Sequence, residues 1–195
     1  RIYRIKPRDI PVKTNLYYKR KFCQFNPEYK FVMNLKQRVH GIYNRVKIAL
    51  ENDIGFKGEL SESELKNKLK YEIIKTVNYA RDEPRIATQQ VFINKDSSLY
   101  HLELLLPLIL NINGKDVYFA LVCRVNNNLK CYEGMSIITR DIAFTNSRLV
   151  GKVNVSWLKP FTSNNTINKN DISTKKILKI SNKYKFNTHN IIFEG

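Results

Sequence analysis

Hydrophobic residues follow two different periods along the chain, and the change of period predicts its architecture. From Phe31 to about Asp53 apolar residues recur every three or four positions, which predicts an amphipathic helix that ends near Gly55. A second helix is predicted to begin after the capping box at Ser61 to Glu64 and to run to about Arg81, with the same apolar spacing. Each helix therefore has an apolar face that must pack against another element.

The central part of the chain predicts three antiparallel strands. Leu102 to Leu110 is an almost unbroken apolar run, typical of a strand that is buried on both faces. Pro107 within it indicates a sheet edge or a bulge, because proline cannot donate to a ladder. The Asn113-Gly114 pair predicts a type I′ hairpin turn into a second strand, Val117 to Val125, and Leu129 to Thr139 returns as the third.

A short helix is predicted to follow the third strand, with Thr139 as its N-cap and Gly151 just beyond its end. At helical spacing Ile142, Asn146 and Leu149 share one face, so Asn146 points where apolar residues point. A further short strand is expected from Ala87 to Ile93. These elements predict an α+β fold, in which two N-terminal helices pack on an antiparallel meander of three to four strands with a short closing helix.

Three short sequence motifs in and after the predicted strands together form a recognisable pattern. Residues 105–108 read Leu-Leu-Pro-Leu, residues 139–149 fit Thr-x-Asp-x-Ala-x-x-Asn-x-Arg-Leu, and residues 157–158 read Trp-Leu. Over about residues 35–158 the chain resembles a mostly bacterial domain of unknown function that often follows a cold-shock RNA-binding domain. The resemblance implies the fold and an association with RNA metabolism. The chain departs from the family pattern at Phe144, Thr145 and Gln89, and no cold-shock domain is visible in it.

The charge balance narrows the class of partner. The 195 residues carry 34 lysines and arginines against 17 acidic residues, a net charge of +17, which favours polyanions: nucleic acid first, anionic membrane second. No apolar run is long enough for a transmembrane segment. The charge is densest at the ends, so we divide the chain into a basic aromatic N-terminal arm (1–30), an α+β core domain (31–158) and a basic, Asn- and Lys-rich C-terminal extension (159–195). We expect this extension, with a helix around residues 172–180, to order mainly on a partner.

Basic side chains alternate with aromatic ones in the N-terminal arm, a combination that contacts phosphates and stacks on bases. The alternative is an arm that packs its aromatic rings on the domain and exposes its lysines to water. Together with basic residues elsewhere, the nucleic-acid-binding candidates are Arg1, Arg4, Arg8, Lys13, Tyr17, Tyr18, Lys19, Arg20, Lys21, Arg85, Arg148, Lys175, Lys176 and Lys179.

Motifs of metal and covalent chemistry are missing from the sequence. The three cysteines form no Cys-x-x-Cys pair, so we predict no metal site and no disulfide framework. The seven glycines form no phosphate-binding loop, and we predict no cofactor. Unpaired cysteines are typical of a reducing intracellular compartment: the cytoplasm, or an organelle matrix if a targeting peptide preceded Arg1. Because the chain starts with arginine, we expect a fragment or a processed chain.

Asp141, Asn146 and Arg148 are the candidates for catalysis. In a functional interpretation Asp141 is a metal ligand or base, Asn146 an orienting amide, and Arg148, with Arg85, an anion ligand; Gln90 is a more remote candidate. In the structural alternative, Asp141 and Arg148 only stabilise the dipole of their helix, and Asn146 satisfies backbone groups of the sheet.

We therefore expect a non-catalytic RNA-binding or RNA-associated module that acts through its basic surface and terminal arms, with RNA as its partner. One alternative is a structural subunit of a larger ribonucleoprotein assembly such as a ribosome, which contacts other protein subunits as well. A second alternative is an RNA-processing enzyme that uses Asp141 and Arg148.

Overall fold

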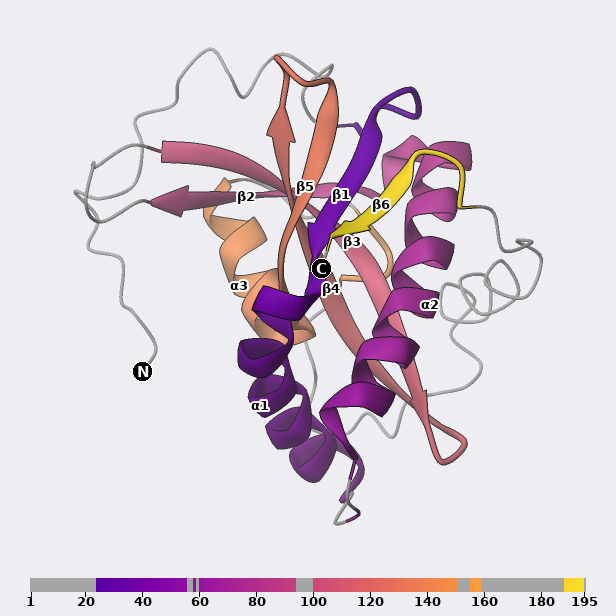
Figure 1. Cartoon of the computed structure of the whole chain (residues 1–195). Helices are drawn as coiled ribbons and strands as arrows, with labels where there is room; N and C mark the ends of the chain where they lie inside the picture. The colour runs from indigo at the N-terminus through magenta and orange to yellow at the C-terminus, as the bar shows by residue number, and fades with distance from the viewer. Residues whose placement is uncertain are drawn as a thin grey trace.

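The computed structural model of the chain describes residues 24–55, 58, 60–93, 100–150, 155–158 and 188–194. The elements along it are β1 (Lys30–Asn34), α1 (Leu35–Ile54), α2 (Glu62–Asp82), the 3₁₀ helix η4 (Pro84–Ile86), β2 (Thr88–Ile93), β3 (Tyr100–Ile112), β4 (Lys115–Asn126), β5 (Cys131–Thr139), α3 (Arg140–Val150) and β6 (Ile191–Glu194). The strands form one mixed sheet in the order β2-β3-β4-β5-β1-β6 (Figure 1). The predicted α+β class is confirmed, but the sheet has six strands among the described residues rather than three to four.

The predicted helix boundaries and hairpin turn are those of the structure, apart from the start of α1. Gly55 follows α1 in the left-handed region, at φ 64°. The capping box of α2 is formed, because the Ser61 hydroxyl accepts from the Glu64 amide and the Glu64 carboxylate accepts from the Ser61 amide. Asn113 and Gly114 both have positive φ, 51° and 76°, as a type I′ turn requires.

The prediction that the first helix begins at Phe31 is wrong, because residues 30–34 form β1. Phe31 and Met33 are buried whereas Val32 and Asn34 are half-buried, which is the period of a strand. The Asn34 side chain then accepts from the Gln37 amide and caps α1. β1 runs parallel to β5 on one side and to β6 on the other.

The last strand, β6, was not predicted. It lies in the stretch that we assigned to the C-terminal extension, and it pairs with β1 from Phe31↔Ile191 to Asn34↔Glu194. Arg81, at the end of α2, holds the turn before it by donating to the carbonyl oxygens of His189 (2.7 Å) and Asn190 (3.2 Å). The helix predicted around residues 172–180 lies outside the described residues.

The end of the predicted N-terminal arm belongs to the core. The Phe25 side chain is 1% exposed and stacks on Tyr132 of β5 at 4.3 Å between ring centroids. The Asn26 amide donates to the Tyr132 hydroxyl at 2.6 Å. Phe25 therefore fits the alternative interpretation, in which the arm packs its aromatic rings on the domain. Arg1 to Cys23 lie outside the described residues.

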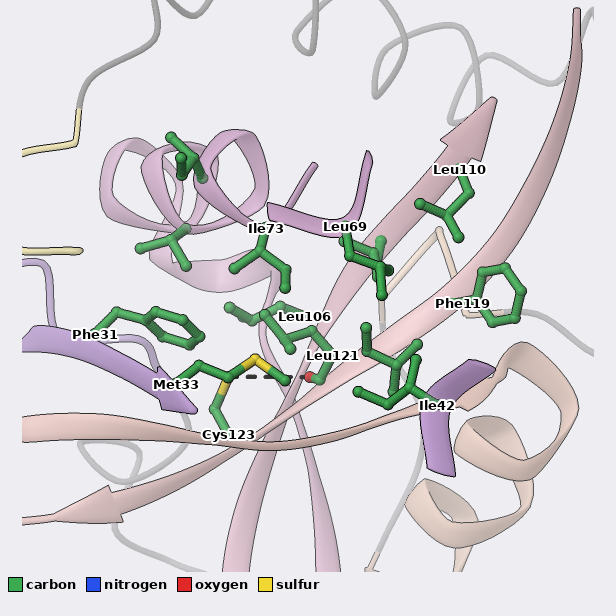
Figure 2. Close-up of a cluster of buried hydrophobic side chains, with 14 of the residues drawn as sticks. Phe31, Met33, Ile42, Leu69, Ile73, Leu106, Leu110, Phe119, Leu121 and Cys123 are labelled. Carbon is green, nitrogen blue, oxygen red and sulfur yellow. Dashed lines mark hydrogen bonds between the residues drawn. The ribbon is translucent and has the colours of Figure 1, made fainter. Parts of the chain in front are cut away.

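The two faces of the sheet bury two separate apolar clusters. Helices α1 and α2 cover one face, where Phe31, Met33, Leu106 and Leu121 meet side chains of both helices (Figure 2). Helix α3 covers the other face, where it contacts β2, β4 and β5. The second cluster lies there and holds Leu105, Ala120, Val122, Ile138, Ala143, Trp157 and Leu158. β3 is therefore buried on both faces, as its apolar run predicts.

Pro107 lies where β3 has only one neighbouring strand. The last pair between β2 and β3 is Thr88↔Leu105, so the ladder on that side ends two residues before the proline. On the other side Pro107 is opposite Ala120 of β4. Its carbonyl oxygen accepts from the Thr76 hydroxyl of α2 at 2.8 Å, which satisfies the buried backbone group. The sequence left an edge or a bulge open at this residue: β3 is an interior strand, between β2 and β4, and the edge exists only locally, where the pairing with β2 has ended.

Candidate functional site

Helix α3 packs on the sheet with a different face from the one we predicted. Ala143 and Ser147 are 0% and 3% exposed, whereas Ile142 is 47% exposed, so the prediction that Ile142 faces inward is wrong. The reason is close packing: small residues let the helix approach Leu105 and Ala120 of the sheet. Asn146 borders this buried face and does point toward the sheet.

Four polar side chains form a continuous hydrogen-bonded row beneath α3, which we call the polar row: Asn146, Gln90, Glu103 and Arg124. Asn146 Nδ2 donates to Gln90 Oε1 at 3.0 Å, and Gln90 Nε2 donates to Glu103 Oε2 at 2.8 Å. Arg124 Nη2 donates to Glu103 Oε1 at 2.9 Å. The sheet register builds the row, because Gln90↔Glu103 and Glu103↔Arg124 are directly opposite pairs on β2, β3 and β4.

The buried carboxylate of Glu103 fixes which groups donate and which accept along the polar row. Glu103 is 2% exposed and Gln90 is 5% exposed, so each must find its hydrogen-bond partners within the protein. A carboxylate only accepts, so the Gln90 amide must turn its NH₂ group toward Glu103 and its oxygen toward Asn146. The NH₂ group of Asn146 then faces Gln90. One charge therefore sets the orientation of both amides.

The other end of the polar row reaches solvent. The Arg124 side chain is 28% exposed, and its guanidinium lies 5.5 Å from the centroid of the Phe92 ring. Phe92 is 44% exposed, on the same face of β2 as Gln90. The pair presents a planar cation beside an aromatic ring at the surface, and Glu103 holds the cation in place.

The described cysteines are not activated nucleophiles. Burial, and to a smaller extent the charge of Glu103, raise the pKa of the Cys123 thiol. Burial also raises the pKa of Cys131. Both thiols therefore stay protonated at neutral pH, and thiolate chemistry has no support at these two positions.

The three catalytic candidates of α3 do not converge. Asp141 and Arg148 are exposed and lie on one side of the helix, about 10 Å apart along its axis, because each residue adds about 1.5 Å. Asn146 points to the polar row instead. Asp141 borders a pocket between α1 and the start of α3. In the part of the chain that the structure describes, no group of three or more His, Cys, Asp or Glu side chains could hold a metal ion.

The two described nucleic-acid-binding candidates both lie at the surface. Arg148 is exposed on α3, with its guanidinium 5.7 Å from the Phe144 ring centroid, and Arg85 is exposed on η4. The backbone beside Arg85 is fixed, because Trp157 Nε1 donates to the Ile86 carbonyl at 2.7 Å. The other candidates lie outside the described residues: Arg1, Arg4, Arg8, Lys13, Tyr17, Tyr18, Lys19, Arg20, Lys21, Lys175, Lys176 and Lys179.

Sequence reasoning missed Phe92, Glu103 and Arg124 as members of a site. The signal that could have found the last two is a single charged residue in each of two apolar strands joined by a predicted hairpin.

Among the residues that the structure describes, none of the helices has the length and the apolar character that a membrane span requires.

Comparison with known proteins identifies the family but gives no further relative. The searches of curated proteins and of solved structures found no match. The model of the family described as "Domain of unknown function (DUF3825)" matches residues 4–157, well over half of the 195 residues. The chain belongs to this family.

Proposed function

We propose that the chain is a non-catalytic RNA-binding module that contacts RNA through its basic terminal segments. The observation that carries the proposal is where the charge lies. Of the 34 lysines and arginines, 16 lie in the described residues, together with 13 of the 17 acidic residues. The net charge of the described residues is thus +3, and the other residues hold +14 of the total +17.

A charge distribution of this kind suits a polyanionic partner. Solubility alone does not need 18 basic residues against four acidic ones in the chain segments outside the described residues. Such segments release condensed counterions when they contact phosphates, which is the main source of affinity for nucleic acid without sequence preference. The segment 159–187 connects Leu158, which is 1% exposed, to β6, so both of its ends are attached to the folded domain.

The Phe92–Arg124 pair favours the binding of single-stranded RNA over the binding of a duplex. An exposed ring beside a guanidinium offers a surface on which an unpaired base stacks, and this contact is worth about 1 to 3 kcal/mol per base. Bases in a duplex are already stacked and cannot use it. The hydrogen bond from Arg124 to Glu103 keeps the guanidinium next to the ring.

The test is the salt dependence of binding to a single-stranded RNA oligonucleotide, measured by fluorescence anisotropy. Substitutions are preferable to deletions, since Phe25 and β6 belong to the core. One variant replaces Lys19, Arg20 and Lys21 with glutamine, and a second replaces Lys175, Lys176 and Lys179. A third, the control, replaces Lys36, Lys47 and Lys68, three exposed lysines of α1 and α2.

Each terminal variant should lower the slope of log affinity against log salt by about 2, because each lost phosphate contact removes about 0.7 from a single-strand slope. The control should leave the slope unchanged. Phe92→Ala should lower the affinity for single-stranded RNA by about tenfold and leave the affinity for duplex RNA unchanged. Equal slopes for all three variants would contradict the proposal.

The same charge distribution also fits a structural subunit of a ribonucleoprotein, whose extensions contact RNA and neighbouring proteins. This second proposal predicts weak binding to free oligonucleotides and crosslinks, in the native cells, to one abundant RNA. Crosslinks scattered over many messages would favour the RNA-binding module.

A further inference from the structure

The surroundings of Arg124 restrict what the Phe92–Arg124 pair can bind. Arg124 lies on β4 with a carboxylate on each of the two neighbouring strands. On β3, Glu103 Oε1 accepts from Arg124 Nη2 at 2.9 Å. On β5, Glu133 is directly opposite Arg124, which places the two Cβ atoms about 4.5 to 5.5 Å apart on one face of the sheet. One positive charge therefore has two negative neighbours.

The Glu133 carboxylate is held by the Asn126 amide. Asn126 Nδ2 donates to Glu133 Oε1 at 2.9 Å, and Asn126 Oδ1 accepts from the Leu129 amide at 3.1 Å, so the turn after β4 fixes the orientation of this amide. The ion pairs of the described residues do not include Glu133, whereas Arg124 and the buried Glu103 neutralise each other. One positive and two negative groups together leave a net negative charge beside the Phe92 ring.

A phosphate group is a poor ligand for this site. Arginine binds phosphate best through paired N–H donors, but Arg124 Nη2 already donates to Glu103, and Nε is buried. The net negative charge also repels a phosphate, and partial burial weakens the screening of this repulsion by salt. The groups on offer are instead the exposed Phe92 ring, the guanidinium 5.5 Å from its centroid, and the half-buried Glu133 carboxylate. They suit an uncharged planar group that carries N–H donors.

We propose that the Phe92–Arg124 pair takes an uncharged nucleobase and that Glu133 keeps phosphates away from it. The base stacks on the ring beside the guanidinium. The carboxylate favours N–H donors, which every RNA base carries on its Watson–Crick edge and exposes only when it is unpaired. The inference rests on the proposed function and deepens it, because it divides the RNA between two parts of the chain: phosphates at the terminal segments and bases at the folded domain.

The test compares two oligonucleotides of equal length and charge, oligouridine and an abasic strand, in their binding to the full chain by fluorescence anisotropy. Arg124→Lys keeps a cation beside Glu103 and removes the guanidinium plane. It should lower the affinity for oligouridine by about fivefold and leave the affinity for the abasic strand unchanged. Phe92→Ala, at an exposed position outside the core, should show the same selective loss. Lysine also binds phosphate, so a phosphate contact predicts that Arg124→Lys binds both strands like the wild type.

Glu133→Gln tests the exclusion of phosphate. Glutamine still offers an oxygen that accepts from Asn126, but the negative charge is gone. The affinity for the abasic strand should rise by about threefold at low salt, as expected for the loss of one charge about 7 Å from a phosphate, and the preference for oligouridine should fall. Glu51→Gln is the matched control: it removes the same charge from an exposed position of α1, on the other face of the sheet, and should leave the preference unchanged.

Failure of this inference and failure of the proposed function give different results. Equal effects of Arg124→Lys on the two strands, or equal effects of Glu133→Gln and Glu51→Gln, would overturn the inference and leave the salt dependence of the abasic strand intact. A loss of that salt dependence would instead overturn the proposed function, since the abasic strand offers the terminal segments only phosphates and sugars. The difference between oligouridine and the abasic strand would then remain.

Discussion

Gln90→Glu tests whether the polar row is organised around one buried charge. The substitution places a second carboxylate where Gln90 Nε2 now donates to Glu103 Oε2 at 2.8 Å, between positions that are 5% and 2% exposed. Two carboxylates this close cannot both stay ionised, so the introduced group must retain a proton. If its pKa rises by about 2 to 3 units above the unfolded value, the free energy of unfolding falls by about 3 to 4 kcal/mol at pH 7.

The sign of the pH dependence follows from the same shift. A carboxyl group whose pKa is raised on folding binds more protons in the folded than in the unfolded state, between the two pKa values. The destabilisation is therefore absent below about pH 4, where the group is protonated in both states, and complete only above about pH 8, beyond the raised folded pKa.

The double variant Gln90→Glu with Glu103→Gln is the matched control. It keeps one carboxylate in the row, moved by one strand. That carboxylate can accept from Asn146 and from the new glutamine, whose oxygen accepts from Arg124. Every hydrogen bond of the row is restored, so the double variant should regain most of the lost stability, to within about 1 kcal/mol of the wild type.

The assay is urea unfolding at pH 5 and pH 7, followed by the fluorescence of Trp157, the single tryptophan. A loss of about 3 kcal/mol corresponds to a decrease of about 6 to 12 °C in Tm for a domain of this size. The reasoning is refuted if Gln90→Glu matches the wild type at pH 7, or if the double variant is no more stable than Gln90→Glu alone.

Three further predictions concern packing and hydrogen bonding elsewhere. Gly134→Ala should lower the unfolding free energy by about 1 to 3 kcal/mol in urea, because a Cβ there would lie 2.7 Å from Met33 Sδ and 2.9 Å from Met33 Cβ; an unchanged midpoint would show that β1 shifts at no cost. Trp157→Phe should cost about 1 to 3 kcal/mol, since the buried Ile86 carbonyl loses its donor; because this variant has no tryptophan, its urea unfolding is followed by circular dichroism, and a neutral result would mean that water replaces the indole. Cys123, buried with a raised pKa, should react with a thiol reagent only at the rate of global unfolding, and faster labelling located by mass spectrometry would contradict the packing of β4.

Local signals predicted the elements that depend on local structure. The capping box at Ser61 and the Asn113-Gly114 turn are interactions among neighbouring residues, and the structure has both. The strands β1 and β6 were missed because five- and four-residue segments hardly reveal a period of two. β1 pairs in parallel with β5 and with β6, and both pairings join residues that are distant in sequence, so neither β1 nor β6 has a local partner to indicate it.

The candidate site also has one part that local sequence signals predict and another part that depends on distant contacts. The inward direction of Asn146 follows from helical spacing, but its partner Gln90 lies 56 residues away in sequence, and only the packing of α3 on β2 brings them together. The three catalytic candidates of α3 were grouped by their nearness in sequence. A helix separates such residues by about 100° per position, so Asn146 and Asp141 point in different directions.

Glu103 and Arg124 could have been paired from the sequence. A glutamate inside an apolar run must find a partner if the run is buried, because an unpaired buried charge is very costly. The two-residue turn at Asn113-Gly114 sets the register of the hairpin, and each of the two charged residues lies ten positions from that turn. They are therefore opposite each other, on one face of the sheet. The buried Glu103 carboxylate thus requires a hydrogen-bond donor, and the hairpin register identifies Arg124 as that donor. Gln90, on the neighbouring strand β2, then completes the polar row.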